Sequence, residues 1–155
     1  MAEGRLDVRI AEAPAMARWA LRARDDAVLS ALIGRALPGR IGEVTDGVAR
    51  LGPDEFHAVL PEGTALPLGE GAAVSVVDVG ARSVGLIVEG SDAAECLSAG
   101  CPLDLDRMAP GRATRTLFET VEIILVRASA ERFEVEVWRS FAPWLRAALE
   151  AARAG

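Results

Sequence analysis

Apolar and polar residues alternate along several short stretches of the chain, which is the pattern of half-buried β-strands. Within residues 17–23, for example, Trp19 and Leu21 fall on the same face. Further strands are expected over residues 41–50, 55–60, 74–79, 84–88, 115–127 and 132–138. Between the strands predicted over residues 41–50 and 55–60, Gly52-Pro53-Asp54 has the composition of a tight turn.

The last predicted strand alternates most regularly. Phe133, Val135 and Val137 face one way, whereas Glu134 and Glu136 face the other. Two carboxylates can serve acid–base catalysis when their environments differ, but these two share one face of one strand. We therefore expect both of them on a solvated face.

Helical spacing replaces alternation in two segments. A first helix begins at Asp25 or Asp26, either of which can cap it, and ends at Pro38-Gly39. Its apolar positions recur at helical spacing: Val28, Leu29, Leu32 and Ile33. A last helix is capped by Ser140 and has Pro143 in its first turn, where proline is tolerated. Its apolar stripe is Phe141, Trp144, Leu145, Ala148, Leu149 and Ala152.

A third, shorter helix is predicted from its ends. Asp92 and Glu95 are spaced like a capping pair, and both carboxylates suit a helix N-terminus. Gly100 stands where a C′ glycine belongs, and Pro102 prevents continuation of the helix.

These elements predict an α+β domain built from two similar strand–helix–strand halves, although no strict sequence repeat is present. The segment Pro61–Gly71 is rich in Gly and Pro and is expected to connect the halves. Residues 1–16 are expected to form a flexible N-terminal tail, and residues 17–155 a single domain. A chain of 155 residues suits one domain.

Composition excludes several classes of partner. The net charge of −6 at pH 7 argues against nucleic acid, whose phosphates require a basic surface. No apolar run approaches the roughly 20 residues needed to cross a membrane, so no membrane partner is expected. The N-terminal residues lack the basic and apolar regions of a secretory signal, and we expect a cytoplasmic location. All basic side chains except His57 are arginines, which can make planar bidentate contacts.

The two cysteines, Cys96 and Cys101, are expected to be free thiols, because a disulfide between them would close only a very small loop. Their spacing is not that of a zinc knuckle, and no second pair exists. The single histidine, His57, lies within a predicted strand and is expected to point outward. A metal site is therefore not predicted.

No complete catalytic or cofactor site is predicted either. Glycine pairs such as Gly69-Glu70-Gly71 lack both the dinucleotide-binding fingerprint and the lysine of a phosphate-binding loop. Asp104 and Asp106 lie in a turn among apolar residues, and Asp104 is expected to be buried there. Helix capping or pairing with arginine is the preferred role for both carboxylates.

Three segments stand out as candidate interface or structural motifs. They are the turn containing Leu103 and Asp104, the strand start Arg115-Thr116, and the strand-to-helix corner Arg139-Ser140-Phe141. An arginine at such a corner can pair with an acidic group or stabilise an interface. We expect Arg139→Ala to weaken assembly or stability more than Arg153→Ala on the last helix.

In combination, these segments resemble the gamma subunit family of heterotetrameric sarcosine oxidase. The landmarks occur in order over residues 17–152. They are Leu51-Gly52-Pro53-Asp54-Glu55-Phe56, Val77-Asp78-Val79 with Arg82, Gly100-Cys101-Pro102-Leu103-Asp104-Leu105, Gly111 with Arg115-Thr116, and Arg139-Ser140-Phe141-Ala142. A single one of them would be weak, but the ordered set is specific.

The resemblance implies a fold similar to the folate-binding domain of the glycine-cleavage T-protein. It also implies a non-catalytic accessory subunit that packs against an alpha subunit, with beta and delta subunits completing the complex. The cofactors of that complex would be FAD, FMN, NAD, zinc and tetrahydrofolate, none of them bound by this chain. The complex would oxidatively demethylate sarcosine, giving glycine, formaldehyde or its folate adduct, and hydrogen peroxide.

Two alternatives stay open. One is a free-standing folate or one-carbon binding module in which Asp104 or Glu55 accepts hydrogen bonds from a pterin ring. The other is a gamma-type subunit of a related dehydrogenase acting on another N-methyl amino acid, and no residue of this chain separates it from the oxidase.

Overall fold

The structure is a computed structural model that describes residues 4–70 and 73–155. The chain forms two compact units. The first unit is Ala15–Ala81, and the second unit combines Met1–Pro14 with Arg82–Gly155.

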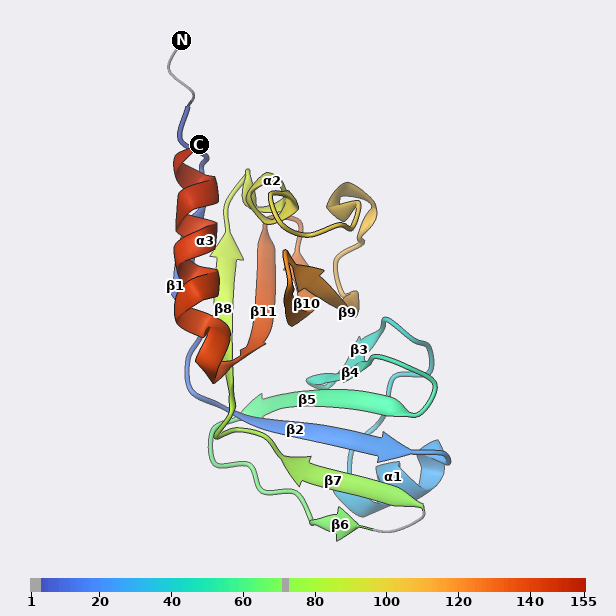
Figure 1. Ribbon diagram of the computed structural model, residues 1–155. Helices are drawn as coiled ribbons and strands as arrows, with labels where there is room; N and C mark the ends of the chain where they lie inside the picture. The colour runs from blue at the N-terminus through green and yellow to red at the C-terminus, as the bar shows by residue number, and fades with distance from the viewer. Residues whose placement is uncertain (1–3, 71–72) are drawn as a thin grey trace. The chain divides into compact units, whose positions relative to one another are not determined.

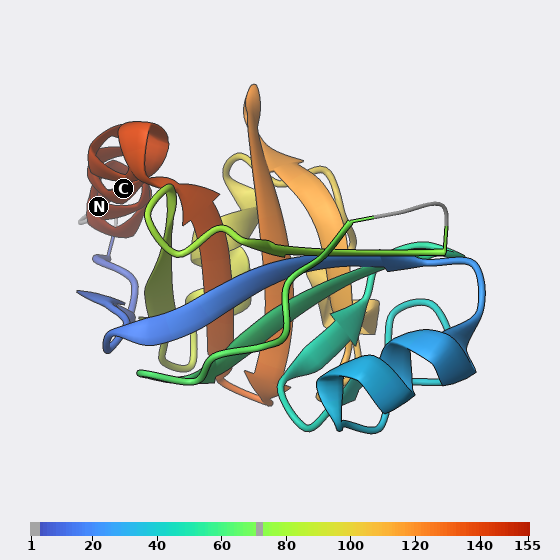
Figure 2. The same cartoon turned by 90° about the horizontal axis from the view of Figure 1, so that it is seen from below.

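The first unit is an antiparallel sheet with one helix on one side (Figure 1). Its elements are β2 (Met16–Ala23), α1 (Asp26–Ile33), β3 (Val44–Thr45), β4 (Val48–Arg50), β5 (Glu55–Pro61), β6 (Gly69–Glu70) and β7 (Val74–Asp78). The strand order is β3-β4-β5-β2-β7-β6. Leu21 and Phe56 of the sheet pack with Leu29 of α1 in a shared apolar core. Figure 2 shows the backbone of this unit from another side.

Helix α1 begins as predicted but ends earlier. The Oδ1 atom of Asp25 accepts a hydrogen bond from the backbone N–H of Ala27 at 2.9 Å, which caps the first turn. At the other end Gly34 adopts a left-handed conformation with φ 67°, and its N–H donates to the carbonyl of Ser30. The predicted end at Pro38-Gly39 is therefore wrong, because Gly34 already terminates the helix.

The strand predicted over residues 41–50 is two strands. Asp46 and Gly47 both have positive φ, 49° and 79°, as a two-residue hairpin turn requires. Val44 pairs with Ala49 across this turn, and Thr45 pairs with Val48. Asp-Gly is a strong hairpin signal, and it splits the segment.

The second unit has a five-stranded antiparallel sheet with the order β1-β8-β11-β10-β9. Its elements are β1 (Arg9–Glu12), β8 (Ser83–Glu89), α2 (Ala93–Ser98), η1 (Leu105–Arg107), β9 (Ala113–Phe118), β10 (Val121–Ser129), β11 (Arg132–Trp138), η2 (Arg139–Phe141) and α3 (Ala142–Ala154). Phe133, Val135 and Val137 contribute to its core, as their alternation predicted. Leu145 and Leu149 of α3 pack against the same core.

In this unit, one strand and the conformation of one glycine differ from the prediction. The strand expected over residues 115–127 is a hairpin, because Glu119 adopts φ 52° and reverses the chain between β9 and β10. No Gly or Pro marks that turn, so it could not be predicted from turn residues. Gly100 follows the Ala99 C-cap of α2 and so occupies the predicted C′ position, but it does not adopt positive φ. Its role is close packing, since a Cβ at this position would lie 2.6 Å from the Phe118 ring.

The helix cap predicted at Ser140 is wrong, whereas the one at Asp92 is right in position only. Helix α3 follows a short 3₁₀ turn, and its N-cap position is Phe141, without a side-chain hydrogen bond. Asp92 occupies the N-cap position of α2, as predicted, but its side chain makes no capping hydrogen bond. Its Oδ2 atom accepts a hydrogen bond from the backbone N–H of Asp7 at 2.6 Å, which holds the N-terminal segment to the unit. Pro143 does lie in the first turn of α3, as predicted.

The expected tail over residues 1–16 contains regular structure. Strand β1 pairs with β8, with Ile10 opposite Val88, and Met16 already belongs to β2. Val8 and Ile10 are buried, so a short alternation in this polar stretch is the signal that was missed.

The boundary between the units also differs from the expected one. Strand β7 belongs to the sheet of the first unit, whereas β8 belongs to that of the second, so the division falls near Ala81 rather than within residues 61–71. Gly69 and Glu70 form the short strand β6, and Gly71 lies outside the described residues. The α+β class with two sheet-and-helix halves is confirmed.

Candidate functional site

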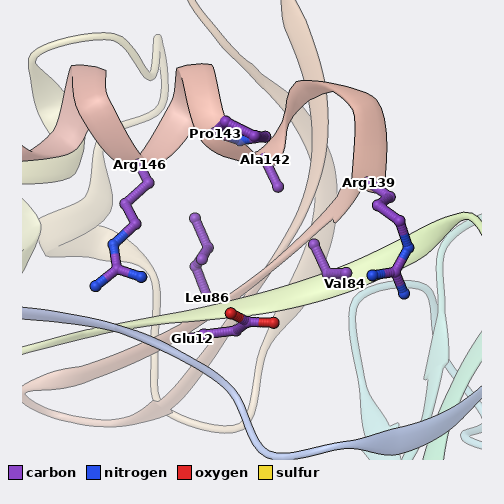
Figure 3. A pocket seen from close by; sticks show the side chains of 7 residues that line it. All are labelled: Glu12, Val84, Leu86, Arg139, Ala142, Pro143 and Arg146. Atoms are coloured by element: carbon purple, nitrogen blue, oxygen red, sulfur yellow. The ribbon is translucent and has the colours of Figure 1, made fainter.

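A pocket of about 350 Å³ lies in the second unit, at the strand-to-helix corner predicted as a motif. Arg139 and Arg146 lie on either side of it, and Glu12 of β1 lies between them (Figure 3). The apolar part of its lining consists of Val84, Leu86, Ala142 and Pro143. The pocket thus combines two guanidinium groups, one carboxylate and an apolar base.

The corner itself is fixed by the backbone. The N–H of Arg139 donates to the carbonyl of Arg82 at 2.6 Å, which ties the end of β11 to the start of β8. The side chains of Arg139, Ser140 and Phe141 are all exposed. The guanidinium of Arg82 lies over the exposed ring of Trp138, 5.8 Å from its centroid. The corner therefore presents arginine and aromatic side chains on a rigid backbone.

Arg115 and Thr116 lie in β9 and have separate contacts. The Nε atom of Arg115 lies 3.2 Å from a carboxylate oxygen of Glu122 in the neighbouring strand. The Thr116 hydroxyl lies 3.9 Å from the Cys101 sulfur, so this motif and the turn that starts at Cys101 are in contact.

Leu103 and Asp104 are exposed, so the expectation of a buried carboxylate in this turn is wrong. Asp104 lies 3.5 Å from Arg107, which is the arginine pairing that was preferred for it. Leu105 turns inward and is buried in the core. The turn buries its second leucine and leaves the carboxylate in solvent.

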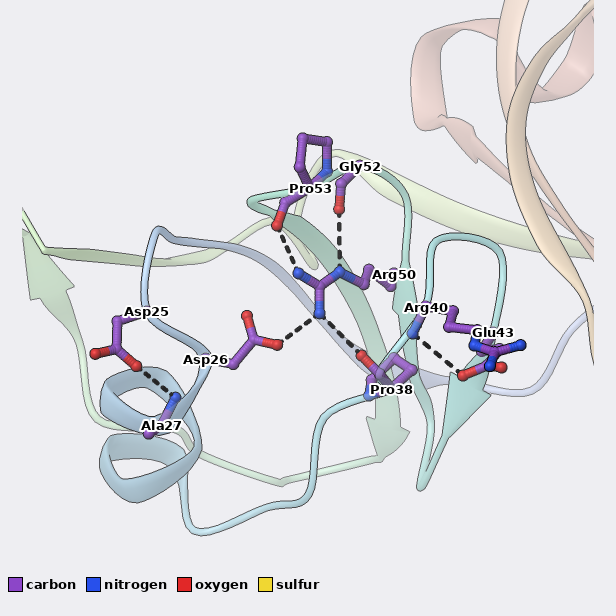
Figure 4. Close-up of polar contacts among 9 residues, drawn as sticks. All are labelled: Asp25, Asp26, Ala27, Pro38, Arg40, Glu43, Arg50, Gly52 and Pro53. Atoms are coloured by element: carbon purple, nitrogen blue, oxygen red, sulfur yellow. Dashed lines mark hydrogen bonds and ion pairs between the residues drawn. The ribbon is translucent and has the colours of Figure 1, made fainter.

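Arg50 makes several side-chain contacts in the first unit, and sequence reasoning did not single it out (Figure 4). Its guanidinium donates to the carbonyls of Gly52, Pro53 and Pro38 at 3.3, 2.6 and 3.2 Å. It also forms an ion pair with Asp26 at 2.6 Å. The landmark segment that begins at Leu51 is thus ordered around a guanidinium, which explains its composition structurally.

Arg127 has the corresponding role in the second unit. Its guanidinium donates to the carbonyls of Leu105, Met108 and Ala130 at 2.9, 2.7 and 2.7 Å. Arg127 therefore holds the end of the Gly100–Leu105 landmark, while Gly100 packs against Phe118 at its beginning. Both landmark segments carry structural contacts.

Two polar side chains expected to face solvent are buried. His57 of β5 and Glu136 of β11 each expose only 7% of their surface. The prediction that His57 points outward, and that Glu136 lies on a solvated face, is therefore wrong. Period-two alternation identifies the two faces of a strand but does not say whether the second face is also covered.

The two cysteines are free, as predicted, and both are buried. Burial raises the pKa of the Cys96 thiol to about 11, and the negative charge of Glu150 adds to this. The thiol donates a weak hydrogen bond to the carbonyl of Leu149 at 3.5 Å. A thiol so placed is protonated at neutral pH and is a poor nucleophile. The exposed Glu89 has its pKa lowered by a hydrogen bond from Arg9.

The described residues do not fit a bound metal ion or the pterin of the folate-binding alternative. Among them, no three His, Cys, Asp or Glu side chains are grouped closely enough to hold a metal ion. Glu55 lies 3.5 Å from Arg22, and Asp104 is paired with Arg107, so both carboxylates proposed for a pterin have arginine partners. Within residues 4–70 and 73–155, no helix has the length and apolarity to cross a membrane.

Comparison with known proteins gives the same relatives in sequence and in structure. The chain is 35% identical over 122 residues to the sarcosine oxidase subunit gamma of an Arthrobacter species, covering 70% of this chain and 60% of the relative. The gamma subunit of Corynebacterium sp. (strain U-96) is 33% identical over 128 residues, covering 74% and 62%. In sequence, the chain is therefore similar to sarcosine oxidase gamma subunits.

These gamma subunits are longer than the part of them that this chain matches, since the alignments span about three fifths of each. A solved structure of heterotetrameric sarcosine oxidase from Corynebacterium sp. U-96, in complex with pyrrole 2-carboxylate, contains a chain that matches 99% of this one. The TM-score is 0.85 and the identity 29%, over 87% of that chain. No family model matches the chain.

The fold expectation is confirmed by a second structure. The glycine cleavage system aminomethyltransferase T from Bartonella henselae matches 94% of this chain and 46% of its own with a TM-score of 0.68. At 17% identity this match concerns the fold alone. This chain thus shares its fold with a chain of the sarcosine oxidase and with the T-protein, as the resemblance implied.

Proposed function

We propose that the chain is a non-catalytic accessory subunit of a heterotetrameric, flavin-dependent sarcosine oxidase and packs against its alpha subunit. The observation that carries the proposal is the match of 99% of the chain to one chain of such an oxidase. Other subunits of the complex would bind the flavin and the sarcosine. This chain would contribute a stable surface to the assembly.

The contacts of the landmark residues support a structural role. The guanidinium groups of Arg50 and Arg127 anchor loops by donating to backbone carbonyls, and Gly100 packs against Phe118. The one thiol with a shifted pKa, Cys96, is held in its protonated form. Residues of this kind stabilise a fold and supply no nucleophile or general base.

The folate-binding alternative has less support. It requires Asp104 or Glu55 to accept hydrogen bonds from a pterin, yet each carboxylate lies 3.5 Å from an arginine. Titration of the purified chain with tetrahydrofolate in a calorimeter tests it, and heat at micromolar ligand would revive it. The dehydrogenase alternative differs only in a substrate pocket that we assign to other subunits. A cytoplasmic location stays a prediction, with which the free thiols agree.

Co-purification tests the proposal directly. The tagged chain is co-expressed with the untagged alpha, beta and delta subunits of a sarcosine oxidase, and an unrelated flavoprotein serves as the control. We expect the tagged chain to capture the flavin-containing subunits and not the control. If the folded chain, present in excess, does not capture the flavin-containing subunits, the proposal is contradicted.

A further inference from the structure

The pocket in the second unit has a charge opposite to that of the chain as a whole. The chain carries a net charge of −6, but the pocket is lined by two arginines and one glutamate. Arg82, whose carbonyl accepts the Arg139 N–H, carries a further guanidinium at this corner, over the ring of Trp138. An acidic protein that gathers guanidinium groups at one corner has a local surface suited to an anionic partner.

Two charged side chains of the pocket form no ion pair in the part of the chain that the structure describes. They are Glu12 of β1 and Arg146 of α3. Figure 3 shows both side chains directed into the hollow over the strand that carries Val84 and Leu86. The guanidinium of Arg146 therefore retains its donors for a group from outside the chain.

Exposed aromatic residues adjoin the same corner. Trp138 exposes 54% of its surface and Phe141 exposes 46%, and both are sequence neighbours of the Arg139-Ser140 pair. Protein interfaces are enriched in Trp, Phe and Arg, whereas a small free anion would leave both rings in water. The aromatic residues thus favour a protein segment over a small molecule as the occupant.

We propose that this pocket receives an aspartate or glutamate side chain presented by a segment of the partner subunit. The carboxylate would lie between Arg139 and Arg146, and an apolar neighbour in the segment would cover Leu86 and Pro143. Bidentate geometry suits a guanidinium–carboxylate contact of this kind. The inference rests on the proposed function, because it names the surface through which the accessory subunit binds.

Opposite charge changes at one pocket provide the test. The affinity of the full chain for the purified flavin-containing subunits is measured by surface plasmon resonance. The double variant Arg139→Glu/Arg146→Glu should bind at least about tenfold more weakly, because it places carboxylates opposite a carboxylate. Glu12→Gln removes the only carboxylate of the pocket and should tighten binding. The control is Arg107→Glu, an 88% exposed arginine side chain of the same unit.

Hydrogen exchange on the wild-type complex provides a second readout that does not depend on variants. Amides around residues 83–86 and 139–146 should become more protected on binding. One outcome is that the complex forms while the protection of these amides stays unchanged and the double variant, Glu12→Gln and Arg107→Glu all bind as tightly as the wild-type chain. In that case the pocket is not the docking surface, although the proposed function stands. A wild-type chain that captures no flavin-containing subunit overturns both. Weaker binding of Glu12→Gln would indicate a basic partner segment and also overturn the inference.

Discussion

Arg50 stacks on Phe56, its cross-strand partner in the β4–β5 hairpin, with the guanidinium carbon 4.9 Å from the ring centroid. The second unit contains the same arrangement. Arg127 stacks on Phe133, its cross-strand partner in the β10–β11 hairpin, at 5.0 Å. In both hairpins the arginine also donates to three loop carbonyls. The two halves of the fold thus use the same contact at corresponding hairpins without a strict sequence repeat.

Removing one of these guanidinium groups should destabilise the fold markedly. Arg127→Met keeps most of the side-chain volume but leaves three carbonyls without their donors, and we expect the free energy of unfolding to fall by about 2–4 kcal/mol. Arg107→Met, at an exposed side chain, is the matched control and should change it by less than about 0.5 kcal/mol. Urea unfolding of both variants measures the difference. Equal stabilities would show that the carbonyls are as well satisfied by water.

Gly100 should tolerate no side chain while Phe118 keeps its place. A Cβ at this position would lie 2.6 Å from the Phe118 ring, which is almost completely buried. We expect Gly100→Ala to lower the free energy of unfolding by about 1–3 kcal/mol through overpacking. Gly39→Ala is the control, because nothing lies within 4 Å of its Cβ and its φ is not positive.

The second variant Phe118→Leu separates packing from a general intolerance of alanine. If contact with the ring is the cause, Phe118→Leu should lower the free energy of unfolding less in the Gly100→Ala variant than in the wild-type chain. The wild type, the two single variants and the double variant are compared in thermal melts. Strictly additive losses of stability would argue against the contact.

Cys96 should make stability fall at high pH. The folded thiol has a pKa of about 11 against an ordinary value of 9.0, so it holds its proton after the unfolded thiol has lost it. The unfolded state binds fewer protons between these values, and stability therefore decreases as pH rises from about 9 to 11, by at most about 1.4 kcal/mol per pH unit. The contribution is fully present below pH 9.

Cys96→Ala should flatten this part of the pH profile relative to the wild-type chain. Chemical denaturation at intervals between pH 8 and pH 11 provides the profile (~1 unit steps suffice). An identical slope for wild type and Cys96→Ala would refute the role of this thiol.

The tryptophans report separately on the two units. Trp19 lies in the first unit, and Trp138 and Trp144 lie in the second. If residues 17–155 behave as a single domain, a chain retaining only Trp19 and one retaining only Trp144 should respond equally to a distant core truncation. Leu21→Ala removes a fully buried side chain of the first unit and should lower both fluorescence midpoints together, at a cost of about 2–5 kcal/mol.

The opposite outcome is as informative. A shift seen only by Trp19, with the Trp144 transition unmoved, would mean that the units unfold independently. Far-ultraviolet circular dichroism on the same samples would then show two transitions.

Local patterning was sufficient to predict most elements of the fold. Alternation located β2, β5 and β11, and helical spacing located α1 and α3, because these signals depend only on which residues face the core. Chain reversals were harder. Asp46-Gly47 carried a readable hairpin signal that was overlooked, whereas Glu119 adopts positive φ in a turn without glycine or proline.

Long-range contacts could not be predicted. Whether His57 and Glu136 are buried depends on what covers the second face of each strand. The assignment of β7 and β8 to different sheets likewise depends on pairing across many residues. Of the candidate site, the corner at Arg139 was found from sequence, but its pocket partner Glu12 was assigned to a flexible tail.

Arg153 turned out to be a poor comparison for Arg139. Its side chain is only 24% exposed and pairs with Glu150 at 2.6 Å. The expectation that Arg139→Ala weakens assembly more than a surface arginine does is better tested against Arg107→Ala, with partner binding and melting temperature measured for both. Comparable losses of binding would remove Arg139 from the interface.

The most direct test of the accessory role is size-exclusion chromatography of the chain with flavin absorbance recorded, alone and mixed with the other subunits of a sarcosine oxidase. We predict that the chain alone elutes colourless and does not oxidise sarcosine, and that in the mixture it moves to the flavin-containing peak. A yellow chain that oxidises sarcosine by itself would contradict the accessory role.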